Sequence, residues 1–141
     1  MNPIPYFDAH CDTIHRCSMA GTPLRDPELR AFYDAAGSLR HSGGHIDLER
    51  AGAFSRYAQI FALYQDPRLL PQGSTMAKQG QLLHQRFLQE MEQNCDVMVH
   101  CRTGRDVDRA AAEGKMAALL SIEGAELLDC RIDRLDMARD W

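Results

Sequence analysis

The sequence predicts an α/β fold with parallel strands joined by right-handed crossovers. Two continuous apolar runs, residues 57–64 and 116–122, have the length and composition of strands buried on both faces, which is typical of parallel sheets. Residues 74–94 lie between these runs and have the periodicity of an amphipathic helix. The alternation of strand, helix and strand carries this prediction.

The composition is that of an ordinary globular protein. The chain has 141 residues, of which 45% are hydrophobic and 26% charged, and its net charge is −4. A chain of this length can form one hydrophobic core, so we expect residues 1–141 to be one domain or part of one. The acidic balance lacks the basic stripe that neutralises phosphates, and we therefore expect no nucleic-acid partner.

The targeting and cysteine patterns predict a cytoplasmic protein. The first ten residues lack the charged and apolar regions of a secretory signal, and no later stretch approaches the about 18 apolar residues of a membrane span. The five cysteines include no CxxC pair of the zinc or thioredoxin type. We therefore expect free thiols and no association with a membrane.

The first expected element is a strand over residues 5–12. Side chains alternate across a strand, which predicts one apolar face and one ionisable face, the first with Phe7, Ala9 and Cys11 and the second with Asp8, His10 and Asp12. This pattern is found in solvated edge strands, and it is also found in strands that place catalytic or metal-ligating side chains at their ends.

Residues 17–52 are rich in Gly, Pro, Ser and Arg and are interpreted as a long excursion from the sheet. One short helix is expected there, over residues 27–36, because Asp26 can cap it and Pro27 can occupy its first position. The apolar run over residues 57–64 then returns the chain to the sheet as its second strand.

The helix over residues 74–94 has the clearest periodicity in the chain. Its apolar face consists of Met76, Leu83, Phe87 and Met91. Ser74 or Thr75 can cap its start, and Asn94 can end it.

Three further elements are expected toward the C-terminus. Residues 97–100 form a short strand, and Thr103 with Asp106 forms an acidic capping box that opens a helix ending at Gly114. After the strand over residues 116–122, apolar side chains recur at helical spacing at Leu128, Ile132, Leu135, Ala138 and Trp141. This predicts a helix over residues 128–141 without a C-terminal cap, so the chain is interpreted as truncated within a larger domain.

Two short motifs have the residue types of a metal site. His10 and Asp12 lie at the end of the first strand and offer an imidazole nitrogen and a carboxylate oxygen on one side. Glu123 directly follows the apolar run over residues 116–122, where a carboxylate needs a cation, hydrogen-bond donors or water nearby. A solvated glutamate at a strand end explains Glu123 equally well at this stage.

The same motifs resemble the renal, or membrane, dipeptidase family of zinc peptidases. Residues 8–12, Asp-Ala-His-Cys-Asp, resemble its Asp-x-His-x-Asp opening. Residues 58–64 look like its second barrel strand, and residues 113–124 are similar to its stretch ending in a metal-bridging glutamate. The order and spacing of the motifs match over nearly the whole chain.

The resemblance implies a metal-dependent hydrolase with a TIM barrel, a (β/α)₈ fold, of which residues 1–141 form about the first three strands and their helices. It implies two zinc ions, Zn²⁺, that activate a water for hydrolysis of a dipeptide, with His10 and Asp12 as ligands of one ion. It also implies that Glu123 bridges both ions and is catalytic. The remaining ligands, two histidines on later strands, and the substrate-binding residues are not in this chain, and the complete enzyme is expected to be a homodimer.

Two alternatives stay open. One is another metallohydrolase of the amidohydrolase type, although that group usually opens with His-x-His and position 12 is Asp. The other is a non-catalytic truncated fragment, because the chain alone is expected to lack activity. The other histidines, at positions 15, 41, 45, 84 and 100, are expected to be surface or core residues rather than ligands.

Overall fold

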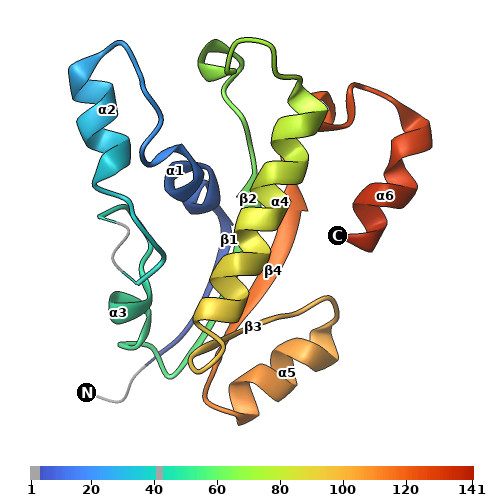
Figure 1. The fold of residues 1–141 in the computed structure, drawn as a ribbon. Coiled ribbons are helices and arrows are strands. Elements are labelled where there is room, and N and C mark those ends of the chain that lie inside the picture. The colour runs from blue at the N-terminus through green and yellow to red at the C-terminus, as the bar shows by residue number, and fades with distance from the viewer. Residues whose placement is uncertain (1–3, 41–42) are drawn as a thin grey trace.

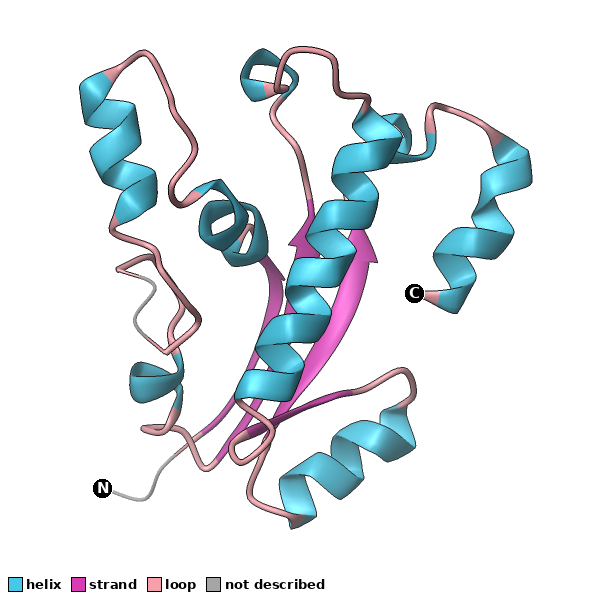
Figure 2. Ribbon diagram, viewed as in Figure 1, coloured by secondary structure: helices cyan, strands magenta, loops and turns pink. Residues whose placement is uncertain are grey.

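The computed structural model describes residues 4–40 and 43–141 and contains one parallel sheet with helices around it (Figures 1 and 2). The sheet has the order β1-β2-β4-β3. Its strands are β1 (Pro5–Cys11), β2 (Arg56–Leu63), β3 (Met98–His100) and β4 (Met116–Ile122). All described pairings are parallel, which confirms the predicted α/β class.

The two apolar runs form the centre of the sheet. β2 pairs with β1 on one side and with β4 on the other, and Phe61, Ala62 and Leu63 are completely buried. The short strand β3 pairs only with the beginning of β4, through Met98 and Met116 among others. The two predicted strands are parallel, and β2 is buried over most of its length, whereas β4 is buried over residues 116–118 and partly exposed over residues 119–122.

One face of the sheet is covered by α1 (Thr13–Met19) and α4 (Met76–Gln93), and α4 lies along the strands in Figure 1. The Thr75 side chain accepts a hydrogen bond from the Lys78 amide and so caps α4, as its sequence predicted. Leu83, Phe87 and Met91 are buried and pack in the same core cluster as Phe61. The predicted apolar face of this helix is therefore the face that contacts the sheet.

The other face carries α5 (Gly104–Ala112) near the beginning of the strands. Both halves of the predicted capping box are present, since the Thr103 hydroxyl accepts from the Asp106 amide and the Asp106 carboxylate accepts from the Thr103 amide. Ala110 packs there with Ala58 and Ala117, which are register partners on neighbouring strands. The carboxyl ends of the strands lie beyond this helix.

The excursion contains α2 (Pro27–Asp34) and α3 (Leu48–Ala51). Asp26 caps α2 as expected, by accepting from the Glu28 and Leu29 amides. The excursion is attached to α4 through Glu90, a fully buried carboxylate that accepts a hydrogen bond from the Leu39 amide at 3.1 Å. These contacts hold the long segment against the core.

The predicted alternation along the first strand is wrong at its end. Asp8 pairs with Gln59 and Cys11 pairs with Phe61, so three steps along β1 match two steps along β2. The extra residue on β1 makes this irregularity a β-bulge. The bulge places Asp8 and Cys11 on the same face of the strand instead of on opposite faces. The strand then ends at Cys11, and Asp12 occupies the N-cap position of α1.

The predicted helix over residues 128–141 is shorter in the structure. It is replaced by two 3₁₀ turns, η2 (Ala125–Leu128) and η3 (Ile132–Arg134), followed by α6 (Leu135–Asp140). Asp129 and Cys130 have φ angles of 53° and 54°, and this left-handed backbone interrupts a right-handed helix. None of the described helices is long and apolar enough to cross a membrane.

Candidate metal centre

The carboxyl ends of β1, β2 and β4 lie together at one edge of the sheet. His10 lies near the end of β1, Asp12 begins α1, and Glu123 directly follows β4. The Glu123 amide donates a hydrogen bond to the Leu63 carbonyl at 3.0 Å, which ties the end of β4 to the end of β2. Parallel strands place such residues at a common edge, where α/β barrels carry their active sites.

His10, Asp12 and Glu123 form a compact group. The His10 Nε2 atom lies 3.3 Å from an Asp12 carboxylate oxygen and 3.3 Å from a Glu123 carboxylate oxygen. One ligand atom from each of the three residues lies within 4.8 Å of the others. The sequence-predicted site residues are therefore brought together.

The donor set fits a zinc ion. Zinc binds histidine nitrogen and carboxylate oxygen at about 2.0 to 2.2 Å, so tetrahedral ligand atoms lie about 3.3 to 3.6 Å apart. The two 3.3 Å separations around His10 match this spacing. The side chains of His10, Asp12 and Glu123 are 53%, 53% and 46% exposed, which leaves them accessible to an ion and a substrate.

The Asp8 carboxylate lies outside the group formed by His10, Asp12 and Glu123. Its carboxylate accepts a hydrogen bond from the His10 amide at 3.0 Å, and it does not belong to the group of converging ligand atoms. Asp8 therefore holds the backbone that presents the His10 ring. The bulge between Asp8 and Cys11 explains this difference from the predicted common face.

The other described histidines do not join the group, as expected. The His84 ring stacks on Trp141 with centroids 4.9 Å apart, and the His100 ring meets the edge of Phe87 at 5.0 Å. Burial lowers the pKa of both histidines and favours their neutral form. His15 is 5% exposed, His45 lies at a cavity, and His41 is outside the described residues.

A cavity of about 480 Å³ opens beside the three ligand residues, and His10 and Asp12 form part of its lining. Its other walls come from α1, α2, residues 44–46 and the segment after β2, and they include His15, Tyr33 and Tyr64. Sequence reasoning did not assign these residues to the site. Only the position of Tyr64, directly after the carboxyl end of a buried strand, gave a signal that could have found one of them.

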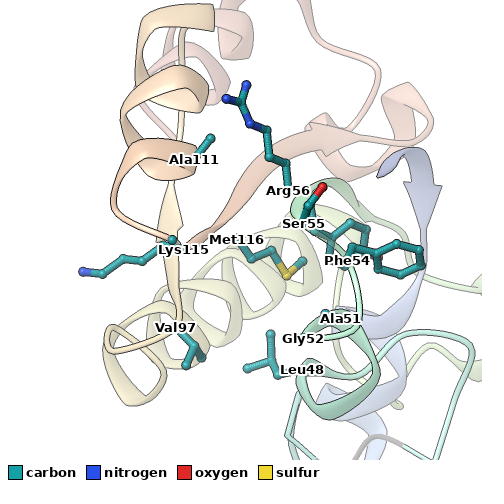
Figure 3. Close-up of a pocket in the computed structure, with 12 residues that line it drawn as sticks. Leu48, Ala51, Gly52, Phe54, Ser55, Arg56, Val97, Ala111, Lys115 and Met116 are labelled. Carbon is teal, nitrogen blue, oxygen red and sulfur yellow. The ribbon is translucent and has the colours of Figure 1, made fainter. Parts of the chain in front are cut away.

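A second cavity, shown in Figure 3, lies at the opposite end of the strands. Its lining includes Leu48, Phe54 and Met116, and the Lys115 side chain points away from it in that view. No histidine, aspartate, glutamate or cysteine contributes to this lining among the residues that the structure describes. Within the described part of the chain, the one group of possible metal ligands is His10, Asp12 and Glu123, at the carboxyl edge of the sheet.

Comparison with solved structures relates this fold to metallopeptidases. The chain superposes on a metallopeptidase from Rhodobacter sphaeroides bound to a phosphinate mimic of the dipeptide L-Ala-D-Ala, with a TM-score of 0.70 and 23% identity over 99% of this chain and 43% of that one. A dipeptidase AC of family M19 gives a TM-score of 0.69 and 24% identity, over 99% of this chain and 42% of that one. The chain has the fold of the family M19 dipeptidases. The resemblance indicated by the motifs is thus confirmed at the level of the fold, which is a partial TIM barrel.

Two further matches are another solved structure and one sequence relative. The probable dipeptidase PvdM from Pseudomonas aeruginosa gives a TM-score of 0.61 and 19% identity, over 97% of this chain and 32% of that one. An uncharacterised protein from the PQQ-III 3′ region of Acinetobacter calcoaceticus is 29% identical over 95% of this chain and 45% of its own length. No family model matches the chain. The chain spans less than half the length of each of these proteins.

Proposed function

We propose that this chain is the N-terminal part of a metal-dependent dipeptidase, a hydrolase that cleaves the peptide bond of dipeptides. The observation that carries the proposal is the convergence of His10, Asp12 and Glu123 at the carboxyl edge of a sheet with the M19 dipeptidase fold. In this proposal residues 1–141 belong to a single barrel domain. The rest of the barrel and the remaining ligands come from a longer protein.

His10 and Asp12 would hold one zinc ion, and Glu123 would hold the same ion and bridge to a second one. A zinc ion bound there supplies Lewis-acid chemistry, because it lowers the pKa of a water ligand and polarises a carbonyl oxygen. His10 offers its Nε2 atom, which already faces both carboxylates. Asp8 fixes the His10 backbone, so the ring is oriented before an ion binds.

Glu123 has a second role in this proposal. One carboxylate oxygen lies 3.3 Å from His10, and the side chain is about half exposed. The carboxylate can therefore accept a proton from a water that attacks the substrate carbonyl, in addition to binding metal. The cavity beside His10 and Asp12 gives a dipeptide room next to this edge.

Metal binding tests the proposal directly. We expect the purified chain to bind one zinc ion, measured by calorimetry and by the absorption of a cobalt-substituted form. Removing one ligand with Glu123→Gln should lower the affinity at least tenfold, because a bound carboxylate is exchanged for a weaker neutral donor. The exposed Glu126→Gln serves as the matched control and should bind zinc like the unchanged chain.

The melting temperature should hardly change in either variant, because exposed charges contribute little to stability. Zinc affinity that is equal in the chain and in Glu123→Gln would contradict the proposed metal site. Lactones and cyclic amides offered to the complete protein beside dipeptides would separate a dipeptidase from another metallohydrolase of the amidohydrolase type.

A further inference from the structure

The Trp141 side chain lies on a notch of α4 that Gly80 and His84 form. A Cβ atom at Gly80 would lie 3.4 Å from the indole ring and 3.2 Å from the Leu127 carbonyl oxygen, so the segments approach closely there. Glycine inside a helix destabilises the helix relative to alanine, and this close approach explains its presence in α4. One turn further along α4, the His84 ring stacks on the indole ring, with centroids 4.9 Å apart and an interplanar angle of 13°.

A second contact fastens the same segment. The Arg102 guanidinium, which follows β3, donates hydrogen bonds to the Asp140 and Trp141 main-chain oxygens, both at 2.8 Å. None of the residues of α6 is buried, and segments with few buried contacts open at a low cost in free energy. The stack on His84 and the hydrogen bonds from Arg102 therefore account for much of what holds α6 in place. Trp141 and α6 also line a cavity of about 470 Å³ against residues 119–122 of β4.

The surroundings of His84 favour its neutral form. Its Nε2 atom is shielded from solvent and has no hydrogen-bond partner among the residues that the structure describes. Burial and, to a smaller extent, the Arg102 guanidinium lower the pKa of His84. The pKa of the neighbouring His100 is lowered by burial, Arg102 and His84, whereas Asp106 opposes this effect. In the imidazolium form, the His84 Nε2 atom would be a charged donor without an acceptor, close to a second positive charge.

The acidic groups around the notch contact other partners or solvent. On α6 the carboxylates lie near a guanidinium of the same helix, those of Asp136 and Asp140 at 3.3 Å and 4.0 Å from Arg139. On η2 the Glu126 residue is exposed. The terminal carboxylate of Trp141 has a pKa of about 3.5 and is ionised over the whole range in which a histidine titrates, so it adds no pH dependence there. His84 is therefore the group whose protonation changes the charge at the stacked ring.

We propose that Gly80, His84 and Trp141 form a proton-sensitive latch, which holds α6 on α4 at neutral pH and opens when His84 is protonated. The attraction between an imidazolium ring and an indole face opposes the opening. The shielded charge without an acceptor and the repulsion from Arg102 favour the opening, and we expect them to be larger. Opening releases α6 and exposes the side of β4 that lines the cavity beneath it.

The direction of the pH dependence follows from the protonation of His84. A lowered pKa in the closed latch means that the open form binds the proton more tightly. The closed latch is therefore fully stable above about pH 6.5, the pKa of an exposed histidine, and it loses stability as the pH falls below this value.

Trp141 is the only tryptophan of the sequence, so its fluorescence reports on the latch directly. Rate constants for quenching by acrylamide, obtained from fluorescence lifetimes, measure the access to the indole ring. Intensity alone is unsuitable, because a stacked imidazolium changes it without any opening. As the pH falls from about 8 to about 5, we expect the quenching rate constant to rise roughly twofold, with a midpoint below about pH 6.5. The pKa of His84 measured by NMR should agree with this midpoint.

Three variants locate the effect. His84→Gln keeps a polar side chain that does not titrate, and it should remove the pH dependence. His100→Gln is the matched control and should keep the transition, because His100 is the neighbouring histidine and its ring meets Phe87 instead of Trp141. Arg102→Gln removes the nearby positive charge and should raise the pKa of His84.

Several results would overturn the inference. These are equal quencher access at both ends of the pH range, a transition that survives in His84→Gln, or a His84 pKa above about 6.5 with lower quencher access in acid. Far-UV circular dichroism over the same range verifies that the chain stays folded, and its loss at the same midpoint would show general unfolding instead of a latch.

Discussion

At the scale of single residues, the arrangement around His10 contributes little to folding. Its ring faces two carboxylates, and all three side chains are about half exposed, a situation in which ion pairs are worth about 0 to 1 kcal/mol. Asp12 and Glu123 also bring like charges to the same edge. Folding stability therefore does not account for the convergence of these three side chains, whereas the proposed metal site would account for it.

The candidate site could be predicted in part from the sequence. Three of its residues lie at the ends of apolar strands, namely His10, Asp12 and Glu123. Because the carboxyl ends of parallel strands share an edge, these positions along the chain were sufficient to predict that the three side chains lie close together. His15, Tyr33 and Tyr64 depend on how α1 and α2 pack beside β2. Such packing between distant segments leaves no local pattern in the sequence.

Alkaline pH should destabilise the chain through two buried thiols. Burial raises the pKa of Cys11 to about 11 and that of Cys17 to about 12, above the value of 9.0 of an exposed cysteine. Because the folded pKa values are raised, this stability is present below pH 9 and is lost as the pH rises through 11 and 12.

Urea unfolding between pH 7 and 11 would measure this loss. Cys17→Ala should make the dependence on pH shallower above pH 9, whereas Cys95→Ala, at an exposed position, should leave it unchanged. An identical slope in Cys17→Ala and the unchanged chain would contradict the assignment.

At the scale of elements, the features with strong local sequence signals were predicted correctly. The capping box at Thr103 and the apolar face of α4 depend on residues within one turn or one helix. The bulge in β1 depends on its pairing with β2, and the break at Asp129 and Cys130 uses left-handed backbone without a glycine. Neither feature has a signal in its own segment, which explains both wrong predictions.

Replacing Glu90 should detach the excursion from α4. The fully buried carboxylate accepts hydrogen bonds from the Leu39 amide and the Asn94 amide group, both at 3.1 Å, and pairs with Arg86 at 2.6 Å. Glu90→Ala leaves these donors unpaired, and we expect a loss of about 3 kcal/mol in the free energy of unfolding. Denaturant unfolding measures it.

The exposed Glu92→Ala on the same helix is the control for Glu90→Ala, with an expected change within about 0.5 kcal/mol. A Glu90→Ala variant as stable as Glu92→Ala would show that the excursion is held mainly by other contacts.

At the scale of the whole molecule, apolar side chains remain uncovered at both ends of the chain. Phe7 on β1 is 59% exposed, and Ile132 and Leu135 near α6 are 84% and 55% exposed. β1 pairs on one side only, with β2, within the described sheet. Exposed apolar surface beside an open strand edge favours association with another chain.

The purified chain should therefore form dimers or larger species and bind a hydrophobic dye. Light scattering after gel filtration measures the mass, and Ile132→Glu combined with Leu135→Glu should shift it toward the monomer. The same two charges at the exposed Leu82 and Leu88 of α4 provide a comparison. A monomer at high concentration without dye binding would show that these residues are tolerated as ordinary surface.

The last prediction concerns catalysis by the chain alone, for which we expect no detectable hydrolysis of dipeptides. One group of three possible metal ligands is present among the described residues, which suits one zinc ion with a water in its fourth position. The resemblance assigns two further histidines to the second ion, and the walls that exclude water and orient a peptide belong to later strands. Positioning and a second metal each contribute several kcal/mol to catalysis, and every 1.36 kcal/mol is tenfold in rate. Zinc-dependent turnover of a dipeptide by the 141-residue chain, lost in Glu123→Gln and kept in Glu126→Gln, would instead show that this partial barrel is a working enzyme.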